Sequence, residues 1–258
     1  MSIFDKDGDA FIPTDAARGP WDPGFLHGGP VAILAGHAVE AIPADQPMRT
    51  ARLTLELTRP VPVAPLTVHA SLLRPGRKGR LVQVSIAAHG KEVARAVALQ
   101  VRRGELHPGA NADDPPPEPH ADSLDGWSEG WAGQGAYFHT LGVELRPLPG
   151  ADPRHPRNVW VRLRTQPIAG HATTPLMRVL AAADFPNGVS LRADPREYLS
   201  INPELTVHVQ REPRGEWVGL TAETYLEADA TGLAEGVLYD EDGRIGRAAQ
   251  SLIIEPRG

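Results

Sequence analysis

The chain has 258 residues, of which 41% are hydrophobic and 22% charged, and its formal net charge is −6 at pH 7. This length suits one large domain or two of ordinary size, and either arrangement would bury a sizeable core. The acidic balance argues against broad electrostatic binding to nucleic acid or to an anionic membrane, and the absence of cysteine excludes disulfides and thiolate chemistry.

The sequence gives no sign of export or of membrane insertion. Its first residues, MSIFDKDGDAF, carry acidic groups and lack the basic start and apolar stretch of a secretory signal. No apolar run approaches the roughly 20 residues that a membrane-spanning helix requires. We therefore expect a soluble protein of the cytoplasm.

The first half of the chain predicts one helix followed by antiparallel strands. A Gly- and Pro-rich stretch, Gly19 to Pro30, leads into an apolar helical segment, Gly29 to Ile42. From Leu53 to Leu57 apolar and polar residues alternate, which is the period of a strand with one buried face. Further strands are expected at 66–73, 80–88 and 93–102, with turn residues between them.

A Pro-rich segment divides the chain. Residues 105–125 are rich in Pro, Asp, Ala and Gly and show no apolar periodicity, so we expect no packed element there. This linker places an N-terminal domain at 1–104 and a C-terminal domain at 126–258.

The second half repeats the order of the first. An apolar helix is expected at 175–184, and the alternation of Leu205, Val207 and Val209 with polar residues predicts a strand. Three more strands are expected at 217–228, 232–239 and 246–254.

The two halves also share residues at a constant offset. The heptad LTLELTR from Leu53 matches LTVHVQR from Leu205, and Arg95 matches Arg247, each 152 residues later (205 − 53 and 247 − 95). One shared offset along a whole half favours duplication over chance. In each half, a sheet curved around the helix would bury the apolar faces of both, which is the α+β hotdog arrangement, although other α+β folds share this order of elements.

Several motifs, taken in order, resemble the double-hotdog acyl-CoA thioesterases of type II, and more closely their shorter bacterial relatives. They are Gly19 to Pro30 before the first helix, then Ser200 to His208, Gly215-Glu216-Trp217, Tyr239 to Gly243 and Ala249-Gln250. The resemblance spans nearly the whole chain. It implies two tandem hotdog domains that hydrolyse an acyl-CoA thioester to free acid and CoA without a cofactor, and a homo-oligomer.

In that family an Asp, a Ser or Thr and a Gln of the C-terminal domain position the attacking water. The matching positions here are Asp184, Ser200 and Gln250. The resemblance implies that Asp184 accepts a proton from water while Ser200 and Gln250 hold the water in line with the thioester carbonyl. At the repeat offset Ser200 and Gln250 correspond to Met48 and Ala98, so we expect one site rather than two.

Each of these residues also has a purely structural interpretation. Asp184 ends an apolar helix, where the helix dipole disfavours a carboxylate by about 0.3 to 1 kcal/mol, and it could instead bond its own backbone in a turn. Gln250 lies on the apolar face of a strand and could be a structural amide bonded to neighbouring backbone. Ser200 before Asn-Pro is ordinary chemistry for the start of a strand.

Two further groups are candidates for binding the substrate. Gly28 and Gly29 at a helix N-terminus could offer backbone N–H groups to the oxyanion, and His27 could polarise the carbonyl. The alternatives are a glycine-rich turn required by packing and an exposed loop histidine. Arg77, Lys78 and Arg80 form the densest basic cluster and could bind the CoA phosphates, although a solvated turn also explains them.

Other signals do not point to a function. Gly126-Trp127-Ser128-Glu129-Gly130 fits the G-x-S-x-G pattern, but it lacks the strand before it and the helix after it that a nucleophile elbow needs. The histidines show no metal-ligand spacing and no nucleotide-binding glycine motif is present, so neither a metal nor a redox cofactor is implied. The rival functions are a hotdog enoyl-CoA hydratase or dehydratase, whose Asp–His loop motif we do not find, and a non-catalytic protein that binds acyl-CoA or another apolar ligand.

Overall fold

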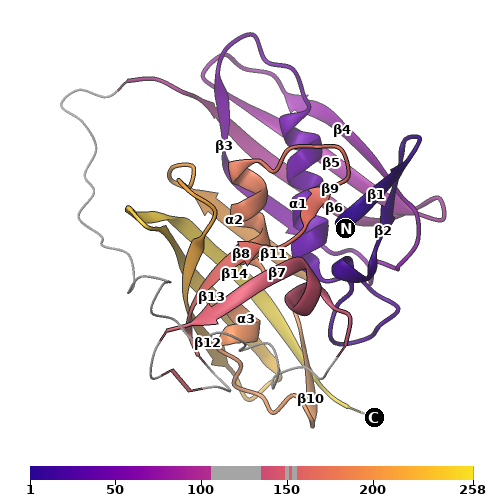
Figure 1. Cartoon of the computed structure of the whole chain (residues 1–258), viewed down its shortest axis with the longest axis vertical. Helices are drawn as coiled ribbons and strands as arrows, with labels where there is room; N and C mark the ends of the chain where they lie inside the picture. The colour runs from indigo at the N-terminus through magenta and orange to yellow at the C-terminus, as the bar shows by residue number, and fades with distance from the viewer. Residues whose placement is uncertain (106–134, 149–150, 153–155, 258) are drawn as a thin grey trace.

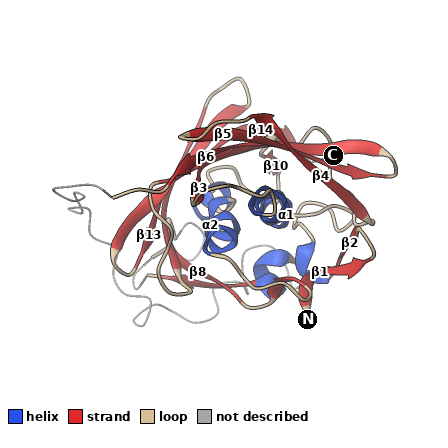
Figure 2. Cartoon of the chain, turned by 90° about the horizontal axis from the view of Figure 1, so that it is seen from above, coloured by secondary structure: helices blue, strands red, loops and turns tan. Residues whose placement is uncertain are grey.

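The computed structural model describes residues 1–105, 135–148, 151–152 and 156–257. Residues 106–125 of the predicted linker and the Gly126–Gly130 motif lie outside this range. Within the described residues, 14 strands form one sheet that curves around two helices (Figures 1 and 2). None of the described helices combines the length and the apolar character needed to cross a membrane.

The first half contains two short strands, a helix and four long strands. They are β1 (Ser2–Asp7), β2 (Ala10–Pro13), α1 (Gly28–Glu40), β3 (Met48–Glu56), β4 (Leu66–Arg74), β5 (Gly79–Ala88) and β6 (Lys91–Arg102). The predicted helix and strands of this half are therefore present, with ends shifted by a few residues. The pair β1 and β2 was not predicted, because β1 is buried at one end and exposed at the other and so does not alternate.

The second half begins, in the described residues, with a π-helical turn at Phe138–Gly142. Its further elements are β7 (Val143–Pro147), β8 (Asn158–Leu163), β9 (Gln166–Ile168), α2 (Pro175–Ala183), α3 (Pro186–Val189), β10 (Tyr198–Ile201), β11 (Glu204–Val209), β12 (Val218–Leu226), β13 (Thr231–Asp240) and β14 (Gly243–Pro256). The predicted helix and long strands are again present, whereas the short strands β7 to β10 were not predicted as separate elements.

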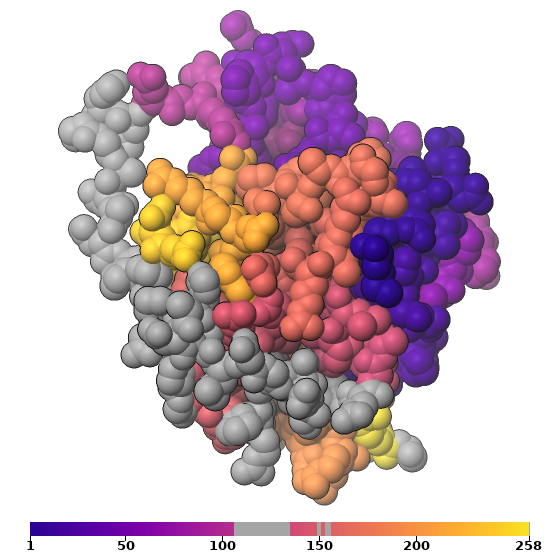
Figure 3. All heavy atoms as spheres, in the orientation of Figure 1, coloured from indigo at the N-terminus to yellow at the C-terminus, as the bar shows by residue number. Residues whose placement is uncertain are grey.

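The sheet joins the two halves through the strands that carry the repeated heptad. The strand order is β7-β8-β12-β13-β14-β11-β3-β6-β5-β4-β2-β1-β9, with β10 paired to β14. Strands β3 and β11 are antiparallel, and Thr54 faces Thr206, its counterpart in the repeat. A second junction lies at the N-terminus, where β1 pairs with β9 of the other half, and the N-terminal residues (indigo) pack beside the second half in Figure 3.

The strand registers agree with the repeat offset. In the first half Met48 pairs with Arg102, and in the second half Ser200 pairs with Ile254, so both partners are shifted by 152 (200 − 48 and 254 − 102). In the same way the pair of Val82 and Ala98 corresponds to the pair of Ala234 and Gln250. The sequence offset therefore describes equivalent positions in the sheet.

The two helices pack against each other inside the curved sheet (Figure 2). Ten of the thirteen residues of α1 are buried, which fits a helix that is apolar on all sides. At Gly36 a Cβ atom would lie 2.4 Å from Cδ1 of Leu180 in α2, so the glycine permits the close approach of the helices. This packing brings the C-terminal end of α2 to the N-terminal end of α1.

Candidate active site

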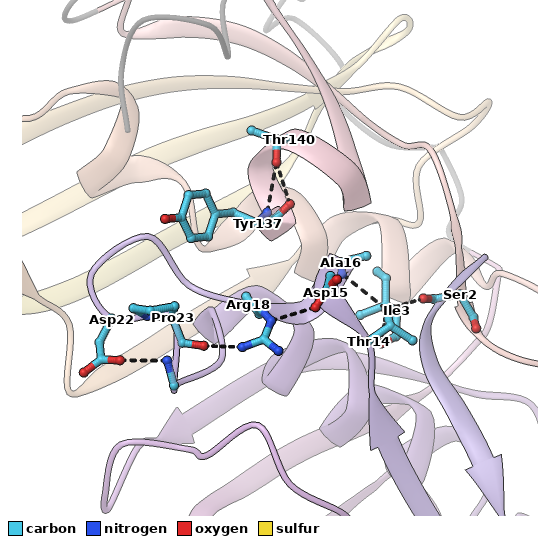
Figure 4. A network of polar contacts seen from close by, with 11 residues as sticks. Ser2, Ile3, Thr14, Asp15, Ala16, Arg18, Asp22, Pro23, Tyr137 and Thr140 are labelled. Atoms are coloured by element: carbon cyan, nitrogen blue, oxygen red, sulfur yellow. Dashed lines mark hydrogen bonds and ion pairs between the residues drawn. The ribbon is translucent and has the colours of Figure 1, made fainter. Parts of the chain in front are cut away.

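The loop before α1 is held by a network of polar contacts (Figure 4). The Thr14 hydroxyl donates to the backbone oxygen of Ser2 at 2.6 Å, and the Arg18 guanidinium donates to Asp15 at 2.8 Å and to the carbonyl of Pro23. The backbone N–H of His27 then donates to the carbonyl of Ala17 at 3.0 Å. These contacts fix the segment that ends at His27, immediately before the helix.

His27 is the N-cap of α1 and faces the carboxylate of Asp184. Its Nδ1 lies 2.8 Å from Oδ2 of Asp184, and its side chain is only 11% exposed. Gly28 follows, and a Cβ there would lie 2.7 Å from the same carboxylate oxygen. Glycine is thus required at position 28 because the carboxylate meets the helix end directly, and the interpretation of His27 as an exposed loop residue is wrong.

Asp184 is a buried carboxylate with partners from three distant segments. Its Oδ1 accepts hydrogen bonds from Nε2 of Gln250 at 2.7 Å and from Nδ2 of Asn202 at 2.9 Å, while Oδ2 faces His27. Asp184 caps the C-terminus of α2, where the helix dipole is unfavourable to it. It also lies at the N-terminus of α1, where a carboxylate is favoured, so the helix packing compensates for the position in its own helix.

Gln250 connects Asp184 to the start of α3. Its amide nitrogen donates to Asp184, and its oxygen accepts from the backbone N–H of Asn187 at 3.1 Å. That N–H belongs to the first turn of α3, which has no partner within the helix. Both ends of the buried amide are therefore satisfied, and one of them holds the proposed catalytic carboxylate.

Ser200 lies one step further from Asp184. Its hydroxyl donates to Oδ1 of Asn187 at 3.0 Å, and Asn187 returns a bond from Nδ2 to the backbone oxygen of Ser200. Ser200 is only 2% exposed. The structure thus links Ser200 to Gln250 through Asn187, and Asn202 rather than Ser200 makes the direct contact with Asp184.

Two aromatic rings pack against the imidazole of His27. The rings of Phe138 and Phe185 lie 5.0 and 5.3 Å from it and stack on each other. His139 is also buried nearby, and burial, followed by the charge of His27, lowers the pKa of His139 to about 3. His139 is therefore neutral near pH 7.

Asp184 and His27 open onto a cavity of about 470 Å³ between the two halves. Its walls are formed by Gly19–Asp22, Phe25–Gly28 and Leu57–Val61 of the first half, and by Asp184, Phe185, Asn187, Gly188, Leu199 and Ile201–Pro203 of the second. Many of these side chains are apolar, and Arg59 adds a cation. A cavity of this size suits a small organic ligand. Neither Ser200 nor Gln250 is part of the wall.

The repeat-related position holds a second cavity, of about 320 Å³, without the same side chains. Met48 and Thr50 line it where Ser200 and Asn202 stand in the other half. Glu40 at the end of α1 accepts a bond from Thr174, the N-cap of α2, at 2.7 Å. The contact between Glu40 and Thr174 thus corresponds to the contact between Asp184 and His27 at the opposite ends of the two helices. Only the second half has an amide at the position of Gln250.

The remaining predicted residues lie differently from the expectation. The N–H of Gly29 points to Nδ1 of His27 at 3.1 Å, so it is engaged within the cap, whereas Gly28 lines the cavity. Arg80 is buried and donates to Gln100 at 2.7 Å and to the carbonyls of Ile42 and Pro43. Its guanidinium stabilises the end of α1, so the interpretation of Arg80 as a residue free to bind phosphate is wrong.

Arg77 and Lys78 are exposed at the tip between β4 and β5. The Arg77 carbonyl accepts a bond from Gln46, just before β3, whereas the cavity of Asp184 begins after the last residue of that strand. At roughly 3.3 Å per residue, β3 separates the two places by about 26 Å. This distance argues against a direct role for the cluster in holding a substrate at Asp184.

Asn202 and Asn187 are the site residues that sequence reasoning missed. Asn202 was visible as the polar residue two positions after Ser200, within a motif already singled out. Asn187 stood in the turn Phe185-Pro186-Asn187-Gly188, where asparagine is common for conformational reasons alone. A contact with Gln250 could not be read from that turn.

Two models of acyl-CoA thioesterase domains match the chain. A model of the acyl-CoA thioesterase C-terminal domain matches residues 111–254, and a model of the acyl-CoA thioesterase N-terminal domain matches residues 17–101. The search of curated proteins finds no match.

Several solved structures share the fold at low identity. A protein of Thermobifida fusca assigned as thioesterase II is 18% identical over 96% of this chain and 93% of its own, with a TM-score of 0.74. A conserved protein with a hot dog fold from Alicyclobacillus acidocaldarius is 16% identical over 99% and 96%, with a TM-score of 0.72. An acyl-CoA thioesterase II of Mycobacterium marinum is 17% identical over 91% of both chains, with a TM-score of 0.63. The chain therefore has a hotdog fold.

Proposed function

Because the chain belongs to the acyl-CoA thioesterase family, we propose that it hydrolyses an acyl-CoA thioester to the free acid and CoA in the cavity lined by Asp184. The observation that carries this proposal is the buried carboxylate at the cavity wall, held by Gln250 and Asn202 and facing His27. A fixed proton acceptor next to an apolar cavity is what attack by water on an acyl thioester requires.

We further propose a double hotdog, with one hotdog domain at 1–104, a linker at 105–125 and a second hotdog domain at 126–258. The repeat-related strand registers and the two helices inside the sheet support this division. The cavity wall contains residues of both halves, so each domain would contribute to one shared site.

Removal of the water proton depends on Asp184 in this mechanism. Gln250 fixes the carboxylate directly, and Ser200 acts through Asn187, which orients the Gln250 amide. The proton can pass to the carboxylate itself or to the imidazole of His27. The backbone N–H of Gly28, at the positive end of α1, is placed to stabilise the oxyanion that forms on the carbonyl.

The substrate would lie with its acyl chain against the apolar wall. Trp21, Phe25, Leu57 and Leu199 line the cavity and can remove an acyl chain from water. Arg59, also in the wall, is the cation placed to meet a phosphate of CoA. The expected homo-oligomer stays a prediction.

The proposal is tested by thiol release from acyl-CoAs of increasing chain length. We expect Asp184→Asn to lower kcat by about 10² to 10⁴, the usual contribution of general-base catalysis, because asparagine keeps the shape of the side chain but lacks the negative charge that takes the proton or stabilises the imidazole that takes it. Gln250→Ala should lower kcat as well, since it frees the carboxylate and leaves the Asn187 N–H unsatisfied. Glu235→Gln, an exposed change on the neighbouring strand β13, is the control and should keep full activity.

The same panel separates hydrolysis from a second candidate, hydration of enoyl-CoA. The 2.8 Å contact between His27 and Asp184 is the observation that supports hydration, because hotdog hydratases also use an Asp and a His. Loss of enoyl absorbance without thiol release would indicate a hydratase. Full activity of Asp184→Asn on every thioester would remove Asp184 from the mechanism.

A further inference from the structure

Nδ1 of His27 has two polar neighbours, one of which requires a proton on Nδ1 and the other a lone pair. Oδ2 of Asp184 lies at 2.8 Å and can only accept a hydrogen bond when ionised, whereas the N–H of Gly29 lies at 3.1 Å and can only donate one. A single ring nitrogen cannot satisfy both. Its protonation state must follow from which contact is stronger.

The contact with Asp184 decides the tautomer. If Nδ1 carried no proton, its lone pair would face a carboxylate oxygen at 2.8 Å in a buried place, with repulsion between the two acceptors. A proton on Nδ1 turns the 2.8 Å contact into an attraction between the ring and the carboxylate, and the N–H of Gly29 then loses Nδ1 as its acceptor. The proton therefore belongs on Nδ1, and in the neutral ring the lone pair is on Nε2.

Nε2 is available for chemistry. It makes no hydrogen bond to any residue in the part of the chain that the structure describes, and His27 lines the cavity. The rings of Phe138 and Phe185, which stack on each other, both pack against the imidazole. A basic nitrogen is thus held in fixed orientation at the wall where a substrate would lie.

Asp184, in contrast, is already surrounded by donors. Gln250 and Asn202 occupy Oδ1, and His27 faces Oδ2. A carboxylate with its oxygens engaged in this way is suited to orient an imidazole and to stabilise its cationic form. It is less suited to bind and deprotonate a water molecule directly.

We propose that His27 is a catalytic residue, whose Nε2 takes the proton from the attacking water while Asp184 orients and stabilises the imidazole. This rests on the proposed thioesterase function and names the group that moves the proton. The water oxygen adds to the carbonyl carbon, the π electron pair moves to the carbonyl oxygen, and the water proton moves to Nε2. When the oxyanion collapses, the C–S bond breaks with its electron pair on sulfur, and Nε2 returns the proton to the thiolate.

Two substitutions separate a catalytic role of His27 from a positioning role. His27→Asn keeps an amide N–H near the position of Nδ1 and so preserves a donor to Asp184, but it removes Nε2. His27→Gln places its amide near the position of Nε2 and removes the Nδ1 donor. We expect both variants to lose at least about 10² in kcat, because neither has a basic ring nitrogen, with KM for the acyl-CoA changing much less.

The pH profile gives a second readout. Among the described residues, the ionisable groups around His27 are Asp184, in contact with it, His139, whose pKa its charge lowers, and Asp22 and Arg59, which line the same cavity. The dependence of kcat/KM on pH should differ between the wild type and His27→Asn, because only the wild type has a basic ring nitrogen at position 27.

The tautomer is tested without any substrate. In protein labelled with ¹⁵N, long-range proton–nitrogen spectra of the histidine side chains should show a proton on Nδ1 of His27 and none on Nε2. The signal is identified by its loss in His27→Asn, and it should shift in Asp184→Asn. A proton found on Nε2 instead would overturn the proposal.

The kinetic outcomes are equally separable. Wild-type kcat in His27→Asn, with loss only in His27→Gln, would show that His27 merely positions Asp184. Wild-type kcat in both would remove His27 from the reaction. If the wild-type protein releases no thiol from any acyl-CoA, both the proposed function and the catalytic step are overturned. Thermal unfolding checks that each variant is folded.

Discussion

Asp184 is placed by its neighbours rather than by its own helix. The end of α2 is an unfavourable position for a carboxylate, yet Gln250, Asn202 and His27 surround it and the N-terminus of α1 meets it. Each of these groups comes from a different part of the chain. A reactive carboxylate can be buried here because donors from both halves of the molecule replace the water it has lost.

His139 makes a separate contribution, to the pH dependence of folding. Its pKa is lowered to about 3, first by burial and then by the charge of His27, from 6.5 in the unfolded chain. Between these values the unfolded chain binds a proton that the folded protein does not, so stability falls as the pH is lowered through this window. The loss from one such group is at most about 1.4 kcal/mol per pH unit.

We therefore expect His139→Phe to flatten the dependence of stability on pH. Phenylalanine keeps a ring that can stack on Tyr137 but does not titrate. The measurement is the free energy of unfolding in urea at several pH values from about 7 down to 4.5. His37 and His208, whose pKa values burial also lowers, are present in both proteins and form the common background. Equal slopes for the two proteins would contradict this account.

At the scale of elements, α1 and α2 depend on Gly36 for their close approach. A Cβ at position 36 would lie 2.4 Å from Cδ1 of Leu180, a side chain that is fully buried and has little room to move. Overpacking of this kind costs about 1 to 3 kcal/mol, against a gain of up to about 1 kcal/mol from replacing glycine in a helix.

Gly36→Ala should therefore destabilise the protein by up to about 2 kcal/mol, the difference between those two effects. The matched control is the same change in a Leu180→Ala background, where the obstructing methyl group is absent. There the alanine should be neutral or stabilising, and the double-mutant cycle gives the coupling between the two residues. Additive effects in the cycle would show that the helices do not meet at this point.

Apolar periodicity predicts the long helices and strands. It does not predict the short strands, whose pairing depends on residues far away in the sequence. Helices α1 and α2 and the long strands follow from apolar patterns, whereas β7 to β10 are short. Arg80 lies on the buried face of β5, at alternate positions with Val82 and Val84. Its basic neighbours Arg77 and Lys78 nevertheless suggested a solvated turn. The strand period was the better guide.

The candidate site was predictable only in part, because its contacts are not local. Asp184, Ser200 and Gln250 were found through resemblance, and the structure joins the first and last directly. The contact between His27 and Asp184 links residues 157 positions apart (184 − 27) and depends on the packing of two helix ends. No spacing in the sequence encodes such a contact.

At the scale of the whole molecule, the two halves share a sheet, a helix contact and a cavity. Strands β3 and β11 pair along the repeated heptad, with Thr54 facing Thr206. The N-terminal strand β1 crosses to pair with β9. Separating the halves would expose the edges of β3, β11, β1 and β9 and the apolar faces of α1 and α2, so neither half has a complete core of its own.

We therefore expect one cooperative unfolding transition rather than two, although the chain is a duplication. In calorimetry the measured enthalpy should equal the van't Hoff enthalpy. Thr206→Pro removes a backbone donor from β11, the strand between β3 and β14. The carbonyl left unsatisfied should cost about 1 to 3 kcal/mol, lowering Tm for the whole chain. A surface change such as Glu235→Gln should leave Tm unchanged. Two separate transitions in the wild-type protein would mean that each half is stable alone, and that the shared cavity forms only after two folded domains dock.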